Sequence, residues 1–146
     1  MATIKRYTDI IKGYTDIYQA KILDEILSSK GADMCFKCFE EETYDLILCE
    51  VSYSEWAKEY KELFDKAGLQ LIPCWSLSAL LSIIPQELFD GEYIINITKG
   101  IDNKWIITYD HHENKNHSYY RLSTGADNLV DACTDIIIKL KERNII

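Results

Sequence analysis

The chain has 146 residues, of which 47% are hydrophobic and 27% charged, and its formal net charge is -8. A chain of this length buries enough surface to fold without disulfides or a metal, so we expect one domain over residues 1–146, with residues 1–14 as a loosely ordered arm. The negative charge argues against a nucleic-acid partner, because nucleic-acid-binding proteins neutralise phosphates with lysine and arginine. It is compatible with a basic protein partner.

The sequence contains no segment that predicts export or membrane insertion. Its first residues, MATIKRYTDI, lack the apolar core of a signal peptide, and no apolar run approaches the ~20 residues of a membrane span. The cysteines number five, which without an export signal indicates reduced thiols rather than a disulfide framework. We therefore expect a cytoplasmic protein that has no membrane partner.

Several segments place apolar residues at helical spacing between start and stop signals. The signals are Thr15 and Gly31, Ser52 and Gly68, Ser76 and Pro85, and the N-cap Asn128 of the last helix. Ser52 is followed three residues later by Glu55, which is typical of a capping box. Lysines in the last turn of the final helix complement the negative end of its dipole.

Two regions predict β-structure. Residues 33–39 and 44–51 are rich in strand-forming residues and predict a hairpin, with the acidic residues 40–42 as its solvated turn. Residues 93–122 predict a three-stranded meander. The two regions lie on either side of the second and third expected helices.

The first turn of the meander can be argued from hydrophobic matching. A three-residue loop over 101–103 places Ile97 opposite Ile107 and Ile95 opposite Tyr109. A two-residue loop would instead place a polar residue opposite Ile107. We therefore expect the three-residue loop, with the neighbouring glycine available for a bulge.

The second turn of the meander is expected at Asn114-Lys115, where a two-residue hairpin loop fits. This register places Tyr109 opposite Tyr120 and Ile107 opposite Leu122 on an apolar face. The opposite face is more polar, and its members include Ile106, Thr108, Tyr119 and Arg121.

These elements predict an α+β fold, in which an antiparallel sheet of hairpin plus meander carries about four helices packed mainly on one face. The other face of the sheet then stays partly open. We expect Thr108, Tyr119 and Arg121 to offer a ligand or interface surface there, because tyrosine combines a large apolar area with a polar group. A homodimer through this face is one form that such contact would take.

Cys35 and Cys38 form a C-x-x-C pair, a spacing that serves redox or zinc chemistry at a helix N-terminus or a metal knuckle. Here the pair falls within an expected strand, so alternation sends the two side chains to opposite faces. No second pair is present in the sequence. We therefore interpret both as core cysteines, and we find no base near any cysteine that would indicate a nucleophile.

The histidines His111, His112 and His117 surround the expected hairpin tip. In the register above, His112 lies opposite His117, and two cross-strand histidines with a nearby carboxylate can bind a divalent ion. The alternative is that a solvated loop tip is simply polar. His112 and His117 are thus weak candidates for a metal site.

Trp75 and Ser76 offer an alternative site of a different class. The expected helix N-terminus after Ser76 can hold an anion, and Trp75 could line a pocket for a small ligand or substrate. This alternative requires Trp75 to border a pocket. The sequence carries no phosphate-binding glycine loop, nucleophile elbow or H-E-x-x-H zinc motif, so we expect no cofactor. The missing motifs argue against an enzyme, and a small enzyme whose site has no linear motif remains the alternative.

Three segments in combination resemble a known family. They are 14–27 (YTDIYQAKILDEIL) followed by Ala32-Asp33-Met34, then 72–85 (IPCWSLSALLSIIP), and 127–146 (DNLVDACTDIIIKLKERNII). They resemble a family of short uncharacterised proteins from Bacteroidetes genomes and their phages or mobile elements. The matched positions include Pro73 to Leu77 and Val130 to Cys133, which are helix starts and helix faces. The resemblance therefore implies a fold and an origin, and it carries no activity.

Together these features predict a non-enzymatic binding or accessory protein of phage or mobile-element origin. We expect it to act through contacts with a protein partner or with further copies of itself.

Overall fold

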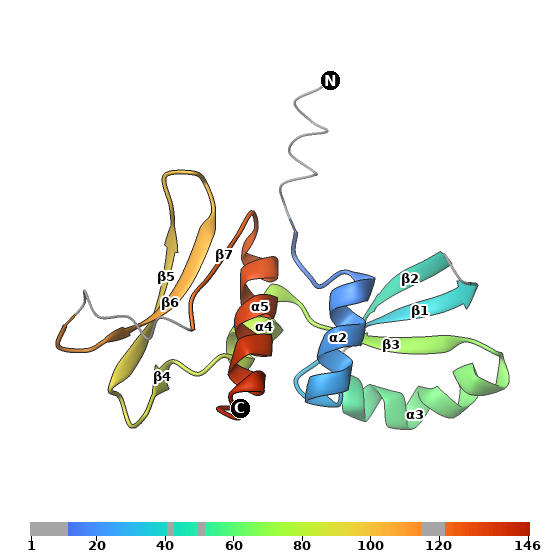
Figure 1. The fold of residues 1–146 in the computed structure, drawn as a ribbon. Helices are drawn as coiled ribbons and strands as arrows, with labels where there is room; N and C mark the ends of the chain where they lie inside the picture. Colours follow the sequence, from blue (N-terminus) through green and yellow to red (C-terminus); the bar gives the residue numbers. More distant parts are fainter. Residues whose placement is uncertain (1–11, 41–42, 50–51, 115–121) are drawn as a thin grey trace, which may run out of the picture. The chain divides into compact units, whose positions relative to one another are not determined.

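The computed structural model describes the chain except residues 1–11, 41–42, 50–51 and 115–121 (Figure 1). The described part has helices and antiparallel sheets, which confirms the expected α+β class. Contacts divide the chain into two compact units, which we call unit 1 (Met1–Gly13 and Leu81–Ile146) and unit 2 (Tyr14–Leu80). The single-domain assignment stays a prediction.

Unit 2 contains a three-stranded antiparallel sheet in the order β2-β1-β3. The expected hairpin is present as β1 (Met34–Glu40) and β2 (Thr43–Leu48). The third strand, β3 (Gln70–Cys74), extends this sheet on the other side of β1 and was not predicted. Because of Pro73, this segment was interpreted as leading into the third helix, although proline is compatible with an edge strand.

The two helices that lie wholly within unit 2 start at polar caps. Helix α2 (Ile17–Leu27) is capped by Asp16 with Gln19 in a capping box, one residue later than expected. It ends at Ser28, whose φ of 50° places the left-handed cap three residues before Gly31. Helix α3 (Tyr53–Lys66) is capped by Ser52, as predicted.

Helices α2 and α3 cover opposite faces of the β2-β1-β3 sheet. Phe36 and Ile72 on one face pack with Ala20 of α2 in a buried cluster. On the other face Lys37 places its Nζ 5.6 Å from the ring centre of Phe64 in α3. Strand alternation explains the division, because Phe36 and Lys37 are neighbours in β1.

Unit 1 contains a four-stranded antiparallel sheet in the order β4-β5-β6-β7. The strands are β4 (Glu87–Leu88), β5 (Tyr93–Lys99), β6 (Trp105–His111) and β7 (Thr124–Ala126). Strand β4 was not predicted from the sequence. Its two residues are too few for a period-2 pattern.

The predicted register of β5 and β6 is confirmed, with Ile95 opposite Tyr109 and Ile97 opposite Ile107. The amide of Gly100 donates to the carbonyl of Lys104 at 2.8 Å and closes the expected three-residue loop. The hydrophobic match therefore determined this register correctly, because Ile107 and Tyr109 are fully buried.

The predicted register of the next hairpin is wrong by two residues. Ile107 pairs with Thr124 of β7 and not with Leu122. A shift of two residues leaves every side chain on the same face, so Leu122 is still buried and the hydrophobic pattern could not detect the error. The expected partners Tyr119, Tyr120 and Arg121 lie outside the described residues.

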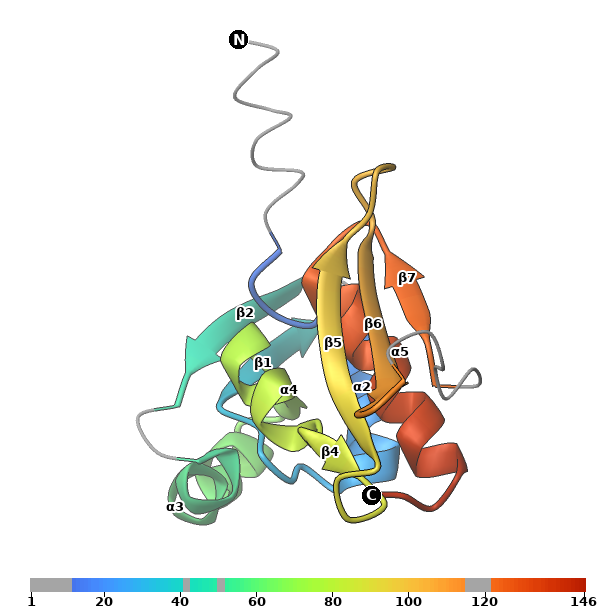
Figure 2. The same cartoon turned by 90° about the vertical axis from the view of Figure 1, so that its left-hand side faces the viewer.

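Helix α5 (Leu129–Glu142) packs on one face of the unit 1 sheet and contacts β6 and β7. Asn128 caps it and accepts a hydrogen bond from the amide of Asp131 at 2.9 Å, as predicted. Its buried residues are Val130, Ala132, Cys133, Thr134, Ile136, Ile137 and Leu140. Figure 2 shows α5 behind β5, β6 and β7, so in unit 1 the described helix packing leaves the other sheet face uncovered.

Helix α4 (Leu77–Ile83) connects the two units along the chain. It begins after Ser76, whose hydroxyl accepts a hydrogen bond from the amide of Ala79 at 3.1 Å, and it ends before Pro85. Both boundaries agree with the sequence signals.

Candidate protein interface

The face of the unit 1 sheet opposite α5, which no described helix of unit 1 covers, is the best candidate for an interaction surface. We call it the open face, and its residues are Ile94, Asn96 and Thr98 of β5 and Ile106, Thr108 and Asp110 of β6. Their neighbours Ile107 and Tyr109 point to the opposite, buried face. Ile94 is 47% exposed and supplies apolar area to the open face.

A hydrogen-bonded polar cluster lies in the middle of the open face. Asn96 is directly opposite Thr108 in the β5–β6 ladder. Both side chains donate to Oδ2 of Asp110, at 3.1 Å from Asn96 Nδ2 and 3.3 Å from Thr108 Oγ1. These bonds hold the polar groups in one arrangement, so less side-chain entropy is lost when another surface binds them.

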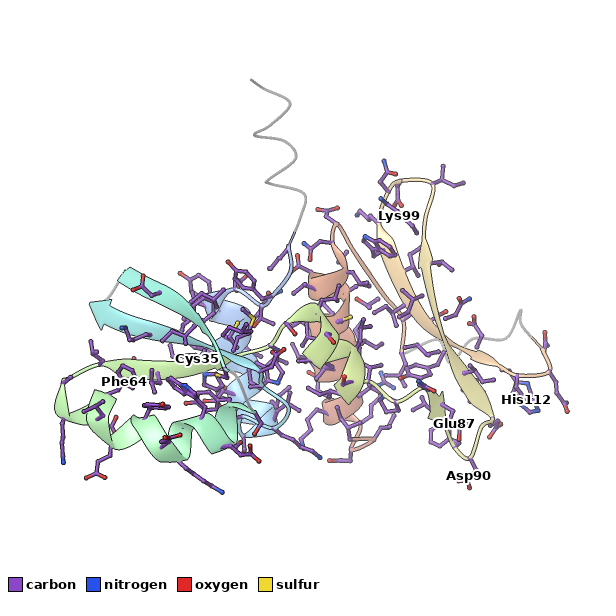
Figure 3. All side chains as sticks on the ribbon, turned by 180° about the vertical axis from the view of Figure 1, so that it is seen from behind. Cys35, Phe64, Glu87, Asp90, Lys99 and His112 are labelled. Atoms are coloured by element: carbon purple, nitrogen blue, oxygen red, sulfur yellow. The ribbon has the colours of Figure 1, made fainter. Side chains whose placement is uncertain are left out.

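One end of the open face is hollowed. A depression of about 300 Å³ is lined by Ile94, Ile95, Asn96, Asp110, His111 and His112. Figure 3 shows His112 at this end of the sheet and Lys99 at the other. The depression brings an aliphatic residue, a carboxylate residue and two histidines together at one end of the sheet.

The two histidines at this end interact with each other and with glutamates. The rings of His111 and His112 stack with centroids 4.9 Å apart. His112 Nε2 lies 3.4 Å from Oε1 of Glu113, and His111 Nε2 lies 3.9 Å from Oε1 of Glu92. Among the residues that the structure describes, no cluster of three histidine, cysteine or acidic side chains could hold a metal ion. His117 lies outside the described residues, so the pairing with His112 stays a prediction.

Sequence reasoning identified part of this surface. Thr108 is on the open face, as expected, whereas Tyr119 and Arg121 lie outside the described residues. Ile94, Asn96 and Asp110 were not named as site residues. The confirmed β5–β6 register places Ile94 and Asn96 on the same face of the sheet as Thr108. The alternation of side chains along β5 was therefore a sufficient signal to identify them.

Trp75 belongs to the core of unit 2. Its side chain has no exposed surface, and its indole Nε1 donates to the carbonyl of Lys30 at 2.9 Å. Its backbone makes two hydrogen bonds with Thr15. The Thr15 amide donates to the Trp75 carbonyl, and the Trp75 amide donates to Thr15 Oγ1. The ligand-site hypothesis required Trp75 to border a pocket. Because the side chain is fully buried, the structure gives no support to that hypothesis.

The carboxylate of Asp33 occupies the position that an anion would take beside Ser76. Asp33 Oδ1 accepts a hydrogen bond from the Ser76 amide at 2.8 Å, and the Ser76 hydroxyl donates to Asp33 Oδ2. The chain thus supplies its own negative charge at the start of α4, which satisfies the polar groups there.

The positions of the cysteines indicate a role in packing and not in catalysis. All five are free, and burial raises the pKa of Cys35 and Cys133 to about 12 and that of Cys74 to about 11. Cys35 lies inside unit 2 (Figure 3) and faces away from Cys38, because the two are three residues apart in β1. A buried thiol with so high a pKa is protonated and weakly nucleophilic at neutral pH.

Comparison with protein-family models, curated proteins and solved structures finds no significant match. Among the described helices, none combines the length and the apolar character that a transmembrane span requires. The resemblance to the Bacteroidetes family therefore stays a prediction.

Proposed function

We propose that this chain is a non-enzymatic accessory protein of a phage or mobile element that binds another protein through the open face. The observation that carries the proposal is the combination of the 47% exposed Ile94 with the hydrogen-bonded Asn96–Thr108–Asp110 cluster. An apolar contact area next to preorganised polar groups is how protein surfaces bind with specificity.

The charge distribution indicates the chemistry of the partner. Asp110 provides an anionic centre on the open face, and the chain as a whole carries -8. A partner with lysine or arginine facing Asp110 would gain both a direct hydrogen bond and faster association. We therefore propose a basic protein surface as the partner, in the cytoplasm.

The chemistry of the buried groups favours this function over an enzymatic one. The raised pKa values of Cys35, Cys74 and Cys133 keep those thiols protonated at neutral pH, so they are poor nucleophiles. Trp75 and Ser76 are engaged by Lys30 and Asp33 of the chain itself. The alternative of a small ligand-binding domain or enzyme near Trp75 has no comparable support.

Affinity capture from cells of the source organism tests the proposal. The tagged chain is expected to retain a protein at constant stoichiometry, and Ile94→Lys is expected to reduce that retention at least about tenfold, because it places a charge in the apolar contact. Ile101→Lys is the matched control, since Ile101 is fully exposed at the tip of the β5–β6 hairpin.

Equal retention by wild type and Ile94→Lys would contradict the proposal. Retention of a small molecule in place of a protein, detected by native mass spectrometry, would favour the ligand-binding alternative instead.

A further inference from the structure

The outer edge of β2 in unit 2 carries backbone groups that point away from its sheet. The amide of Cys49 donates to the carbonyl of Asp33 at 3.1 Å, so the backbone of Cys49 points toward the β1 side. Backbone direction alternates along an antiparallel strand, so the N–H and C=O groups of Leu46 and Leu48 point outward. Among the described strands, β2 pairs with β1 alone.

Exposed apolar side chains accompany this edge. Leu46 is 36% exposed and Leu48 is 69% exposed. Both lie on the same face of the sheet as Phe36, which is opposite Leu46 in β1. Tyr14, 40% exposed, contacts Phe36 edge-on with ring centroids 6.3 Å apart and extends the apolar strip. The strip and the outward backbone groups are therefore adjacent.

Two residue types that often protect an edge strand, lysine and proline, are missing from β2. Its sequence, TYDLIL, contains no lysine and no proline. Its single charge, Asp45, is opposite Lys37 of β1, and the irregularity in the pairing falls at the Cys38–Glu40 end of the ladder. The centre of the strand is thus regular, nearly uncharged and apolar.

We propose that a second copy of this chain adds to the β2 edge, with the two β2 strands antiparallel about a twofold axis at Ile47. In this register Leu46 of each copy is opposite Leu48 of the other. Their outward N–H and C=O groups then bond reciprocally, and the exposed leucines cover one another. The three-stranded sheet of one copy continues into that of the second copy.

A second copy fits this edge because the β2 strand is complementary to itself. A twofold axis normal to the sheet keeps the Phe36 side of both copies on the same face, so apolar residues meet apolar residues. Centring the axis on Leu46 would place Asp45 against Ile47, whereas centring it on Ile47 places Asp45 against the neutral Cys49. The second register therefore avoids burying a charge against an apolar side chain.

Sedimentation velocity of the full untagged chain tests the proposal. We expect a monomer–dimer equilibrium whose dissociation constant is below about 100 µM. Leu48→Lys is expected to raise the dimer dissociation constant at least about tenfold, and Ile101→Lys is expected to leave it unchanged. Circular dichroism checks that both variants are folded. A monomer over the whole range, or equal effects of the two variants, would overturn the proposal.

A pair of complementary variants separates loss of the interface from loss of folding. Leu46→Lys with Leu48→Lys, and Leu46→Glu with Leu48→Glu, are each expected to be monomeric, and their mixture is expected to form a heterodimer. The register is tested with Ile47→Cys. Cα atoms of a non-hydrogen-bonded antiparallel pair are about 4.5 Å apart, within disulfide range, so mild oxidation should crosslink position 47 to itself. The matched variant Ile101→Cys should not crosslink, and equal crosslinking of the two would refute the register.

This dimer is independent of partner binding by unit 1. Ile94→Lys is expected to leave the dimer intact, and Leu48→Lys is expected to leave capture of the partner intact. If Ile94→Lys abolished self-association and Leu48→Lys did not, the dimer would form through the open face and the β2 proposal would be wrong.

Discussion

Replacing Trp75 with alanine is expected to lower the free energy of unfolding by about 3–5 kcal/mol, as measured by urea denaturation followed by circular dichroism. The side chain is fully buried and its Nε1 is bonded to the Lys30 carbonyl, so the variant loses packing and leaves a cavity and an unsatisfied carbonyl. Trp75→Phe retains most of the ring and should cost less, about 1–2 kcal/mol.

Tyr18→Ala is the control for this experiment. Tyr18 is also aromatic, but it is 76% exposed on α2, so its replacement should change the free energy of unfolding by less than about 0.5 kcal/mol. If Trp75→Ala were as stable as Tyr18→Ala, the description of Trp75 as a core residue would be wrong, and its role in a ligand site would have to be reconsidered.

Raising the pH above 9 is expected to destabilise the protein progressively. Burial raises the pKa of Cys35 and Cys133 from 9.0 to about 12 and that of Cys74 to about 11, so the folded chain retains protons that the unfolded chain releases. The stabilisation is therefore complete below pH 9 and is lost as the pH rises from 9 toward 11–12. Each thiol should account for about 1 kcal/mol by one pH unit above its ordinary pKa.

Denaturant titrations between pH 7 and 10, with reductant present, measure this effect. Cys133→Ala removes one of the titrating groups, so its unfolding free energy should fall less steeply over the same interval. A free energy of unfolding that stays level to pH 10 would show that the thiols ionise as readily in the folded chain as in the unfolded one.

Local signals in the sequence predicted most helix boundaries of this fold. Ser52, Ser76 and Asn128 each accept the capping hydrogen bond that their position implied. The end of α2 differs because Ser28 adopts the left-handed conformation before Gly31 is reached. Such positive φ values are uncommon for serine, so the residue type does not predict them.

Strand pairing was predictable only where the hydrophobic residues distinguished one register from another. For β5 and β6 a one-residue shift would have exposed Ile107, so the pattern allowed one solution. For β7 a two-residue shift left the faces unchanged, so the pattern did not distinguish the predicted partner Leu122 from the observed partner Thr124. Strand β3 was missed because its pairing with β1 depends on residues that are far apart in the sequence.

The candidate interface was predictable to the same extent as the sheet. Alternation in β6 placed Thr108 on the open face, and the cross-strand pairing with Asn96 followed from the confirmed register. The hydrogen bonds to Asp110 and the exposure of Ile94 depend on side-chain conformation and on which face α5 covers. These are three-dimensional properties, which a single sequence does not specify residue by residue.

Photo-crosslinking from the open face tests the proposed function most directly. A photoreactive amino acid at residue 94, in the full chain expressed in cells of the source organism, is expected to yield one predominant crosslinked protein. The same group at residue 101, which is more exposed than residue 94 because it lies at the hairpin tip, is expected to yield little of that product. Equal yields from the two positions, or no protein product from residue 94, would contradict the proposal that the open face binds a protein partner.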